Sequence, residues 1–267
     1  MNTIYTLGID IGSTTSKCAI LKDGEELVAT SLQRGGLGTG GPEEALAELW
    51  KKSGLSREKM DRVIATGYGR KKFSSADGEV SELTCHAMGG RFIFPDLRTV
   101  IDIGGQDAKI ISLTADGKMS NFIMNDKCAA GTGRFLEVMA NILCLDIDQL
   151  GAIAAQSDKP APISNTCTVF AESEVISQMA NGVERADLVA GICQSVATRV
   201  ASLARRAGVT PRVCMSGGVA RNESVRRYMA DALGVEIAYD PLAQHFGAIG
   251  AAFYGWRQAN QCYFGNF

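Results

Sequence analysis

The stretch Asp10-Ile11-Gly12-Ser13-Thr14-Thr15-Ser16-Lys17 follows an apolar run that predicts a buried strand over residues 3–10. A second strand is predicted over residues 18–21, so the stretch forms the turn of a β-hairpin, whereas a P-loop joins a strand to a helix. Glycine lets the backbone approach a phosphate, and hydroxyl and N–H groups donate to its oxygens. The stretch therefore predicts a phosphate-binding turn in which Asp10 would orient Mg²⁺ through water.

The same layout occurs a second time. Asp102-Ile103-Gly104-Gly105-Gln106-Asp107 lies between strands predicted over residues 99–102 and 108–113. Each hairpin continues through an Asp-Gly turn into a third strand, over residues 26–31 and 118–124, and then into helices. One such motif is weak evidence, and both could be ordinary hairpin turns. Two at equivalent points of a repeated unit, together with Ser216-Gly217-Gly218 after a strand at residues 212–215, predict a nucleotide-binding α/β protein.

The repeat also predicts the domain organisation. The first subdomain should span residues 1–96 and include the closing helix over residues 245–262, and the second should span residues 97–244. Helical spacing and stop signals predict further helices over residues 42–52, 81–94, 148–156, 167–181, 186–207 and 222–233.

Composition narrows the class of protein. The 267 residues are 46% hydrophobic and 21% charged with a net charge of −2, which gives no electrostatic footprint for nucleic acid or an anionic membrane. No apolar run is long enough to span a bilayer and the first residues lack a basic signal region, so we expect a cytoplasmic protein. There are eight cysteines but no Cys-x-x-Cys pair, which argues against a zinc knuckle or a self-contained ferredoxin motif.

A third glycine-rich stretch, NDKCAAGTGRF at residues 125–135, contains Cys128 and leads into a predicted helix. A turn of Gly131, Thr132 and Gly133 at a helix start would present free N–H groups and the positive end of the helix dipole to an anion. The sulfur of Cys128 would lie at the edge of this anion-binding site.

The duplicated halves, the two Asp-Gly turns and the late Gly-Gly turn resemble the actin, hexokinase and Hsp70 ATPase superfamily, which has a duplicated ribonuclease H-like fold. Residues 125–133 and CTVFAESE at residues 167–174 narrow the resemblance to the activator ATPases of 2-hydroxyacyl-CoA dehydratases, relatives of the benzoyl-CoA reductase ATPase subunits. The resemblance spans nearly the whole chain, through residues 241–244 and the closing helix.

The resemblance implies ATP or ADP with Mg²⁺ in a cleft between the halves, with phosphate on the two turns and adenosine on the late Gly-Gly turn. Asp10, Asp102 and Asp107 would then be catalytic. The implied nucleotide-binding residues are Gly12, Ser13, Thr14, Thr15, Ser16, Lys17, Gly104, Gly105, Gln106, Gly131, Thr132, Gly133, Gly217, Gly218 and Gln244.

Cys128 and Cys167 are the candidate metal ligands. Each is expected to begin a helix, where the dipole favours an anionic group. A cubane iron–sulfur cluster needs four thiolates, so a twofold homodimer would supply the other two. The resemblance implies this arrangement, one [4Fe–4S] cluster per homodimer; the alternative is that both are small buried hydrophobes. Cys18, Cys144, Cys193 and Cys214 are expected in the core. Cys85 and His86 are expected to form a helix-face pair in the first half, and Cys262 has no assigned role.

The function implied is ATP-dependent transfer of one electron from a reduced ferredoxin or flavodoxin, through the cluster, to a partner 2-hydroxyacyl-CoA dehydratase. Two alternatives use the same phosphate turns. One is a small-molecule kinase, such as a sugar or pantothenate-type kinase, and the other is a non-enzymatic actin-like assembly protein.

Overall fold

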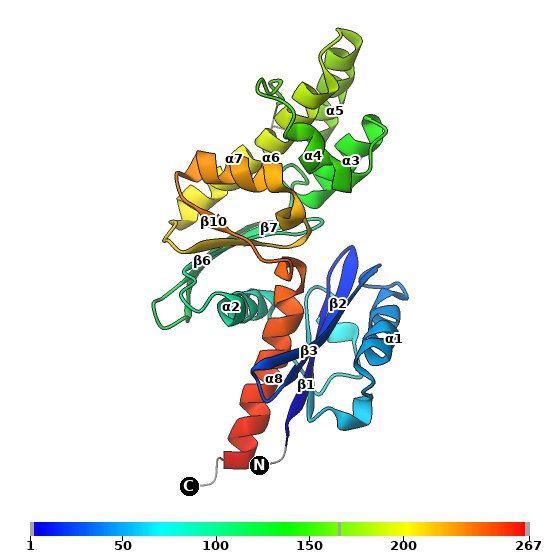
Figure 1. Ribbon diagram of the computed structural model, residues 1–267, viewed down its shortest axis with the longest axis vertical. Helices are drawn as coiled ribbons and strands as arrows, with labels where there is room; N and C mark the ends of the chain where they lie inside the picture. The colour runs from blue at the N-terminus through cyan, green and yellow to red at the C-terminus, as the bar shows by residue number, and fades with distance from the viewer. Residues whose placement is uncertain (1–2, 165–166, 265–267) are drawn as a thin grey trace. The chain divides into compact units, whose positions relative to one another are not determined.

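A computed structural model describes residues 3–164 and 167–264. The chain forms two compact units, one of Met1–Asp96 with Gln244–Phe267 and the other of Leu97–Ala243. Figure 1 shows the helices and strands of both units.

The first unit is built on a five-stranded sheet in the order β3-β2-β1-β4-β5. The first three strands form an antiparallel meander, and β4 and β5 continue the sheet in parallel. The strands are β1 Tyr5–Ile11, β2 Thr15–Lys22, β3 Glu26–Arg34, β4 Arg62–Thr66 and β5 Gly78–Glu79. Side chains such as Leu7, Ile9, Cys18 and Ile20 are fully buried, as expected for strands covered on both faces.

Three helices cover this sheet, with α1 on one side and the pair α2 and α8 on the other (Figure 1). They are α1 Gly41–Ser53, α2 Glu82–Ile93 and α8 Phe246–Phe264; the short 3₁₀ turns η1 Arg57–Lys59 and η2 Arg70–Lys72 lie between α1 and α2 in the chain. Gly54 ends α1 in the left-handed conformation at φ 66°, as its position predicts. The run of small residues after Pro241 lets α8 pack closely on both α2 and β1.

The second unit repeats the pattern. Its sheet has the order β10-β9-β6-β7-β8, with β6, β7 and β8 antiparallel and with β9 and β10 parallel to β6. The strands are β6 Thr99–Ile103, β7 Ala108–Leu113, β8 Met119–Asn125, β9 Val213–Ser216 and β10 Ile237–Ala238. Read from β8, the order and directions match those of β3 to β5 in the first unit. The predicted duplicated α/β fold is therefore confirmed.

The helices of the second unit fall into two groups. The long helix α6 Arg185–Ala207 packs on β7 and β8 and against α7 Glu223–Leu233. Three shorter helices gather beside α6, beyond the sheet (Figure 1). They are α3 Gly133–Ile142, α4 Leu150–Ala154 and α5 Thr168–Ala180, with the 3₁₀ turns η3 Ile147–Gln149 and η4 Gly218–Arg221; η5 Ala243–His245 leads into α8.

Some local predictions were wrong. The second strand begins at Thr15 rather than Cys18, since the hairpin is tighter than its glycine content suggests. The helix predicted over residues 148–156 is a 3₁₀ turn followed by one helical turn and a half. Cys144 is exposed, because α3 ends at Ile142 and Cys144 takes a left-handed φ of 53° in the turn that follows. No described helix is long and apolar enough to cross a membrane.

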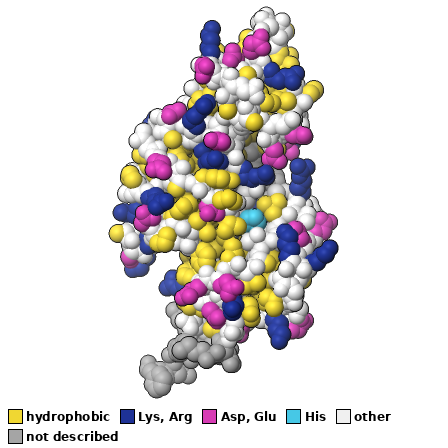
Figure 2. Space-filling model, in the orientation of Figure 1, with side chains coloured by type: hydrophobic (Ala, Val, Ile, Leu, Met, Phe, Trp, Pro, Cys, Tyr) yellow, Lys and Arg dark blue, Asp and Glu magenta, His cyan; other side chains and the backbone are white. Residues whose placement is uncertain are grey.

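Charged side chains of both signs are interspersed on the face seen in Figure 2. That face carries no large patch of one charge of the kind used to bind a phosphate backbone.

Candidate functional site

The first phosphate turn is held by an ion pair across its hairpin. Asp10 near the end of β1 and Lys17 on β2 are direct partners in the strand register, and Lys17 Nζ lies 3.1 Å from Asp10 Oδ2. Asp10 is buried, while Ser13 is half-buried and Thr14 is exposed at the tip of the turn. The turn thus combines accessible hydroxyl groups with a fixed carboxylate and a fixed ammonium.

A glycine-rich loop packs on this turn. Gly35 N donates to the Thr14 carbonyl at 2.9 Å, and Leu37 N donates to the Gly12 carbonyl at 3.1 Å. A Cβ on Gly36 would lie 2.0 Å from the Gly12 carbonyl oxygen, so only glycine permits the approach. Ser16 is buried and its hydroxyl donates to the Gly35 carbonyl at 2.9 Å, so it holds the loop in place and does not face solvent.

The second turn has the same pair in a more buried setting. Asp102 and Lys109 are direct partners in the register of β6 and β7, and Lys109 Nζ lies 3.4 Å from Asp102 Oδ2. The same ammonium lies 2.7 Å from Asp107 Oδ2. Ser216 Oγ donates to Asp102 Oδ1 at 2.8 Å. All four residues are buried.

Asp107 has capacity left for another ligand. Its Oδ2 is at ion-pair distance from Lys109, yet it accepts no aligned hydrogen bond from the described residues. The two observations agree, because a short contact at a poor angle supplies charge but leaves a lone pair free. A carboxylate oxygen of this kind suits a Mg²⁺-bound water.

Lys109 and Ser216 are site residues absent from the predicted set. The signal for Lys109 lies in the sequence, because it follows Asp102 by seven residues as Lys17 follows Asp10. Ser216 lies at the end of a strand far from Asp102 in the sequence. Its contact with Asp102 can be recognised only when the pairing of β6 with β9 is known.

The Gly131-Thr132-Gly133 turn is joined to the second phosphate turn. Gly133 N donates to the Gly104 carbonyl at 2.9 Å, and Arg134 N donates to the Gly105 carbonyl at 2.8 Å. Thr132 N donates to the Ala129 carbonyl. The expectation of free N–H groups for an anion was therefore wrong for Thr132 and Gly133, because neighbouring carbonyls use them. The turn ties the start of α3 to Gly104 and Gly105.

The late Gly-Gly turn lies beside Asp102. Gly217 follows Ser216, its φ is 82°, and its N–H donates to the Ala243 carbonyl at 3.2 Å. Gly218, which begins η4, is exposed. Gln244 comes next after Ala243 in the chain and is half-buried in the first unit.

The two candidate ligand cysteines differ from the other cysteines of the chain. Cys128 and Cys167 are half-buried. Burial raises the pKa of Cys18, Cys85 and Cys193 to about 12 and raises that of Cys214 further still, so these four thiols are inert core groups. The side chain of Cys262 lies outside the described residues.

Cys128 and Cys167 also differ from each other. Cys167 is the N-cap of α5, as predicted. Cys128 does not begin a helix: it lies in the loop after β8, five residues before α3, because the turn of Gly131 and Thr132 comes between them. Its loop is held by Asn125, whose Nδ2 donates to the Cys128 carbonyl at 2.9 Å.

The loop of Cys128 leads into α3 and Cys167 begins α5, and these two helices pack on each other and on α6. Among the described residues, no three His, Cys, Asp or Glu side chains are grouped to hold a metal.

Helix α5 exposes apolar side chains directly after Cys167. Val169 and Phe170 are 66% and 68% exposed, and Ile176 and Met179 follow on later turns at 51% and 42%. A group of large apolar side chains on one helix is a feature of interaction surfaces.

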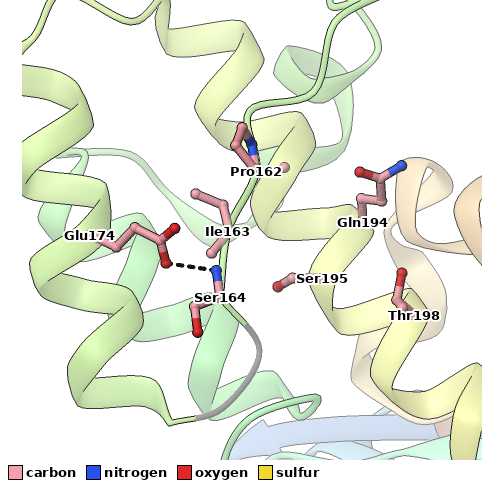
Figure 3. A pocket seen from close by; sticks show the side chains of 8 residues that line it. Pro162, Ile163, Ser164, Glu174, Gln194, Ser195 and Thr198 are labelled. Atoms are coloured by element: carbon pink, nitrogen blue, oxygen red, sulfur yellow. Dashed lines mark hydrogen bonds between the residues drawn. The ribbon is translucent and has the colours of Figure 1, made fainter.

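A separate cavity of about 380 Å³ lies in the second unit between residues 162–164, α5 and α6 (Figure 3). Glu174 lines it and accepts a hydrogen bond from Ser164 N at 2.6 Å. Gln194 and Thr198 of α6 line its other side. None of the predicted nucleotide or metal residues lines it.

Comparison with known proteins gives the family. A model of the BadF/BadG/BcrA/BcrD ATPase family matches residues 7–255. The chain belongs to this ATPase family.

Relatives within the family are close. The (R)-2-hydroxyglutaryl-CoA dehydratase activating ATPase of Acidaminococcus fermentans is 55% identical over 257 residues, which are 96% of this chain and 98% of the relative. The solved structure of the activator of the 2-hydroxyisocaproyl-CoA dehydratase from Clostridium difficile with bound ADPNP is 51% identical, covers 99% of this chain and 98% of its own, and has a TM-score of 0.96. The predicted resemblance to dehydratase activators is confirmed.

The wider fold is also confirmed. A ROK family glucokinase from Streptomyces griseus, solved with glucose and AMPPNP, has a TM-score of 0.56 at 14% identity and covers 95% of this chain and 99% of its own. At that identity the likeness shows the fold alone. The close relatives are named as activators, and the kinase alternative is therefore not favoured.

Proposed function

We propose that this ATPase is a dehydratase activator that works as a homodimer and delivers one electron to a partner 2-hydroxyacyl-CoA dehydratase. The observation that carries the proposal is the pair of half-buried thiols, Cys128 in the loop before α3 and Cys167 at the start of α5, two helices that pack on each other. The names of the close relatives supply the partner class. A reduced ferredoxin or flavodoxin is the proposed electron donor.

The nucleotide would be ATP or ADP with Mg²⁺. Gly12, Ser13 and Thr14 would contact phosphate in the first unit, and Gly104, Gly105 and Gln106 would do so in the second. Asp10, Asp102 and Asp107 would orient the metal and its waters, since Mg²⁺ keeps much of its hydration shell. Lys17 and Lys109 fix these carboxylates in place.

The other predicted nucleotide residues take different roles in the proposal. Gly217, Gly218 and Gln244 would contact adenosine. Thr15 and Ser16 lie in β2 and would support the first turn. The Gly131-Thr132-Gly133 turn would transmit a change in the conformation of the second turn to α3, through its hydrogen bonds.

Two copies of Cys128 and Cys167 would hold one [4Fe–4S] cluster across a twofold axis, and this cluster would supply a one-electron carrier. The thiols fit this role because they are half-buried and do not lie in the core. The exposed apolar side chains of α5 support contact between copies at the same place.

A short path would connect nucleotide and thiols. The Gly133–Gly104 and Arg134–Gly105 hydrogen bonds tie the second phosphate turn to the loop that carries Cys128. For one electron, about 59 mV corresponds to about 1.4 kcal/mol. An ordinary allosteric coupling of about 1–3 kcal/mol would therefore change the potential by roughly 40–130 mV. A larger change requires stronger coupling, for which direct hydrogen bonds are better suited than a long path.

The test is iron and acid-labile sulfide content of protein purified without oxygen, with its mass in solution. We expect four of each per dimer. Cys128→Ser and Cys167→Ser should each lose the cluster and dehydratase activation, while Cys144→Ser, at the exposed thiol after α3, should keep both. Iron-free wild-type protein that phosphorylates a small acceptor would favour the kinase, and open polymers without iron would favour the assembly protein.

A further inference from the structure

Arg199 reaches Cys128 from a distant part of the chain. It lies on α6, 71 residues after the cysteine, and its Nη2 donates to Cys128 Sγ at 3.4 Å. Both side chains are half-buried, so the contact is partly shielded from water. A hydrogen bond from a charged donor is stronger than a neutral one, and shielding strengthens it further.

The stem of the same side chain packs on the loop that joins Cys128 to α3. A Cβ on Gly131 would lie 3.2 Å from Arg199 Cδ and 3.4 Å from Cγ, and the φ of Gly131 is 87°. Arg199 therefore touches this loop at two points, the sulfur and the glycine. Such a contact fixes where the sulfur points.

The positive group beside each of the two cysteines is different. Cys167 has the N-terminus of α5, a helix of 13 residues. Cys128 lies outside any helix, and the guanidinium of Arg199 supplies a full charge in place of a helix dipole. Arginine stays charged at all relevant pH values, so this charge is permanent.

We propose that Arg199 is a positioning residue for Cys128: its guanidinium orients the sulfur as a cluster ligand and, by donating to it, makes the bound cluster easier to reduce. The inference rests on the proposed function. Hydrogen bonds to ligand sulfurs and nearby charge set the reduction potentials of iron–sulfur clusters. Reduction adds negative charge beside the sulfur, which a donated hydrogen bond stabilises.

The test compares Arg199→Gln and Arg199→Lys with Arg206→Gln, a control with the same charge change at an exposed position on the same helix. Iron content and the midpoint potential are measured on each anaerobic dimer. At the midpoint potential of the wild-type cluster, the ratio of reduced to oxidised cluster in Arg199→Gln should be about tenfold lower. This corresponds to a midpoint potential lowered by about 59 mV. Arg199→Lys should fall between, because lysine keeps the charge without the planar fork.

Equal midpoints for Arg199→Gln and Arg206→Gln would overturn the inference. If Arg199→Gln fails to fold or to hold iron, the comparison of Arg199→Lys with Arg206→Gln decides in the same way. Wild-type protein without iron would overturn the proposed function itself, which separates the two failures.

Discussion

Lys17 stands directly across the first hairpin from Asp10, with its ammonium 3.1 Å from the carboxylate, and the fold repeats this pairing once. In the second unit Lys109 stands across from Asp102 at 3.4 Å and also contacts Asp107 at 2.7 Å. The repetition shows that the duplicated unit includes a lysine as well as an aspartate and a glycine turn. In the proposed site the lysine would neutralise carboxylates that would otherwise repel the phosphates of the nucleotide.

Replacing Lys109 by Met should destabilise the protein strongly. The substitution leaves the buried carboxylates of Asp102 and Asp107 without their shared cation, and breaking a buried pair in this way costs about 3–5 kcal/mol. The free energy of unfolding from urea denaturation measures the loss. Lys118→Met is the matched control, because Lys118 pairs with Asp116 while 84% exposed, and it should leave stability nearly unchanged. Equal losses for the two variants would contradict the prediction.

Replacing Gly36 by Ala should weaken ATP binding. The new Cβ would lie 2.0 Å from the Gly12 carbonyl oxygen, so the loop must move away from the first phosphate turn. We expect about a tenfold higher Kd for ATP, or about 1.4 kcal/mol, measured by calorimetry. Gly40→Ala is the control: the nearest atom to its Cβ is a side-chain oxygen of Glu44 at 3.6 Å. Unchanged affinity in Gly36→Ala would show that the loop does not shape the site.

Much of the fold could be predicted from local signals. The strands around both phosphate turns follow from apolar runs, and the two hairpins from their Asp-Gly pairs; Asp23 and Gly24 do take positive φ, as such a turn requires. Cys18, Cys193 and Cys214 could be placed in the core because they lie within apolar runs. Cys144 could not be placed correctly from the sequence. Its exposure depends on where α3 ends, and that depends on how Leu143 and Leu145 pack.

The site was less predictable where it depends on pairing between distant segments. Arg199 meets Cys128 only because α6 crosses the loop after β8, and nothing near either residue indicates this contact. The N–H group of Gly133 was expected to be free because its acceptor, the Gly104 carbonyl, belongs to another motif. Lys109, by contrast, could have been predicted from the sequence, because it follows Asp102 by seven residues as Lys17 follows Asp10.

His245 should make stability depend on pH. Burial, reinforced by the charge of Lys17, lowers its pKa to about 4, while a hydrogen bond to the Ser31 backbone acts the other way. Its Nδ1 has no hydrogen-bond partner among the described residues. Between pH 6.5 and 4 the unfolded chain binds a proton that the folded protein does not, so the free energy of unfolding falls as the pH falls.

From pH 7 to pH 5 this loss should amount to about 2 kcal/mol. It should be absent in His245→Gln, which removes the titrating group and keeps an amide donor. Urea denaturation of both proteins at several pH values gives the comparison. A difference in stability between them that stays constant over this range would rule out His245 as the cause.

The exposed face of α5 should hold the proposed dimer together. Phe170 is 68% exposed and lies three residues after Cys167, so in a closed dimer it would be buried beside the shared thiols. Phe170→Asp places a charge there and should raise the dimer dissociation constant at least tenfold, or about 1.4 kcal/mol, in sedimentation measurements. Phe122→Asp, at a 43% exposed site on β8, should leave it unchanged. If each copy supplies half of the ligands, as proposed, the Phe170 variant should also lose iron as it is diluted, whereas a cluster held within one chain would survive dilution.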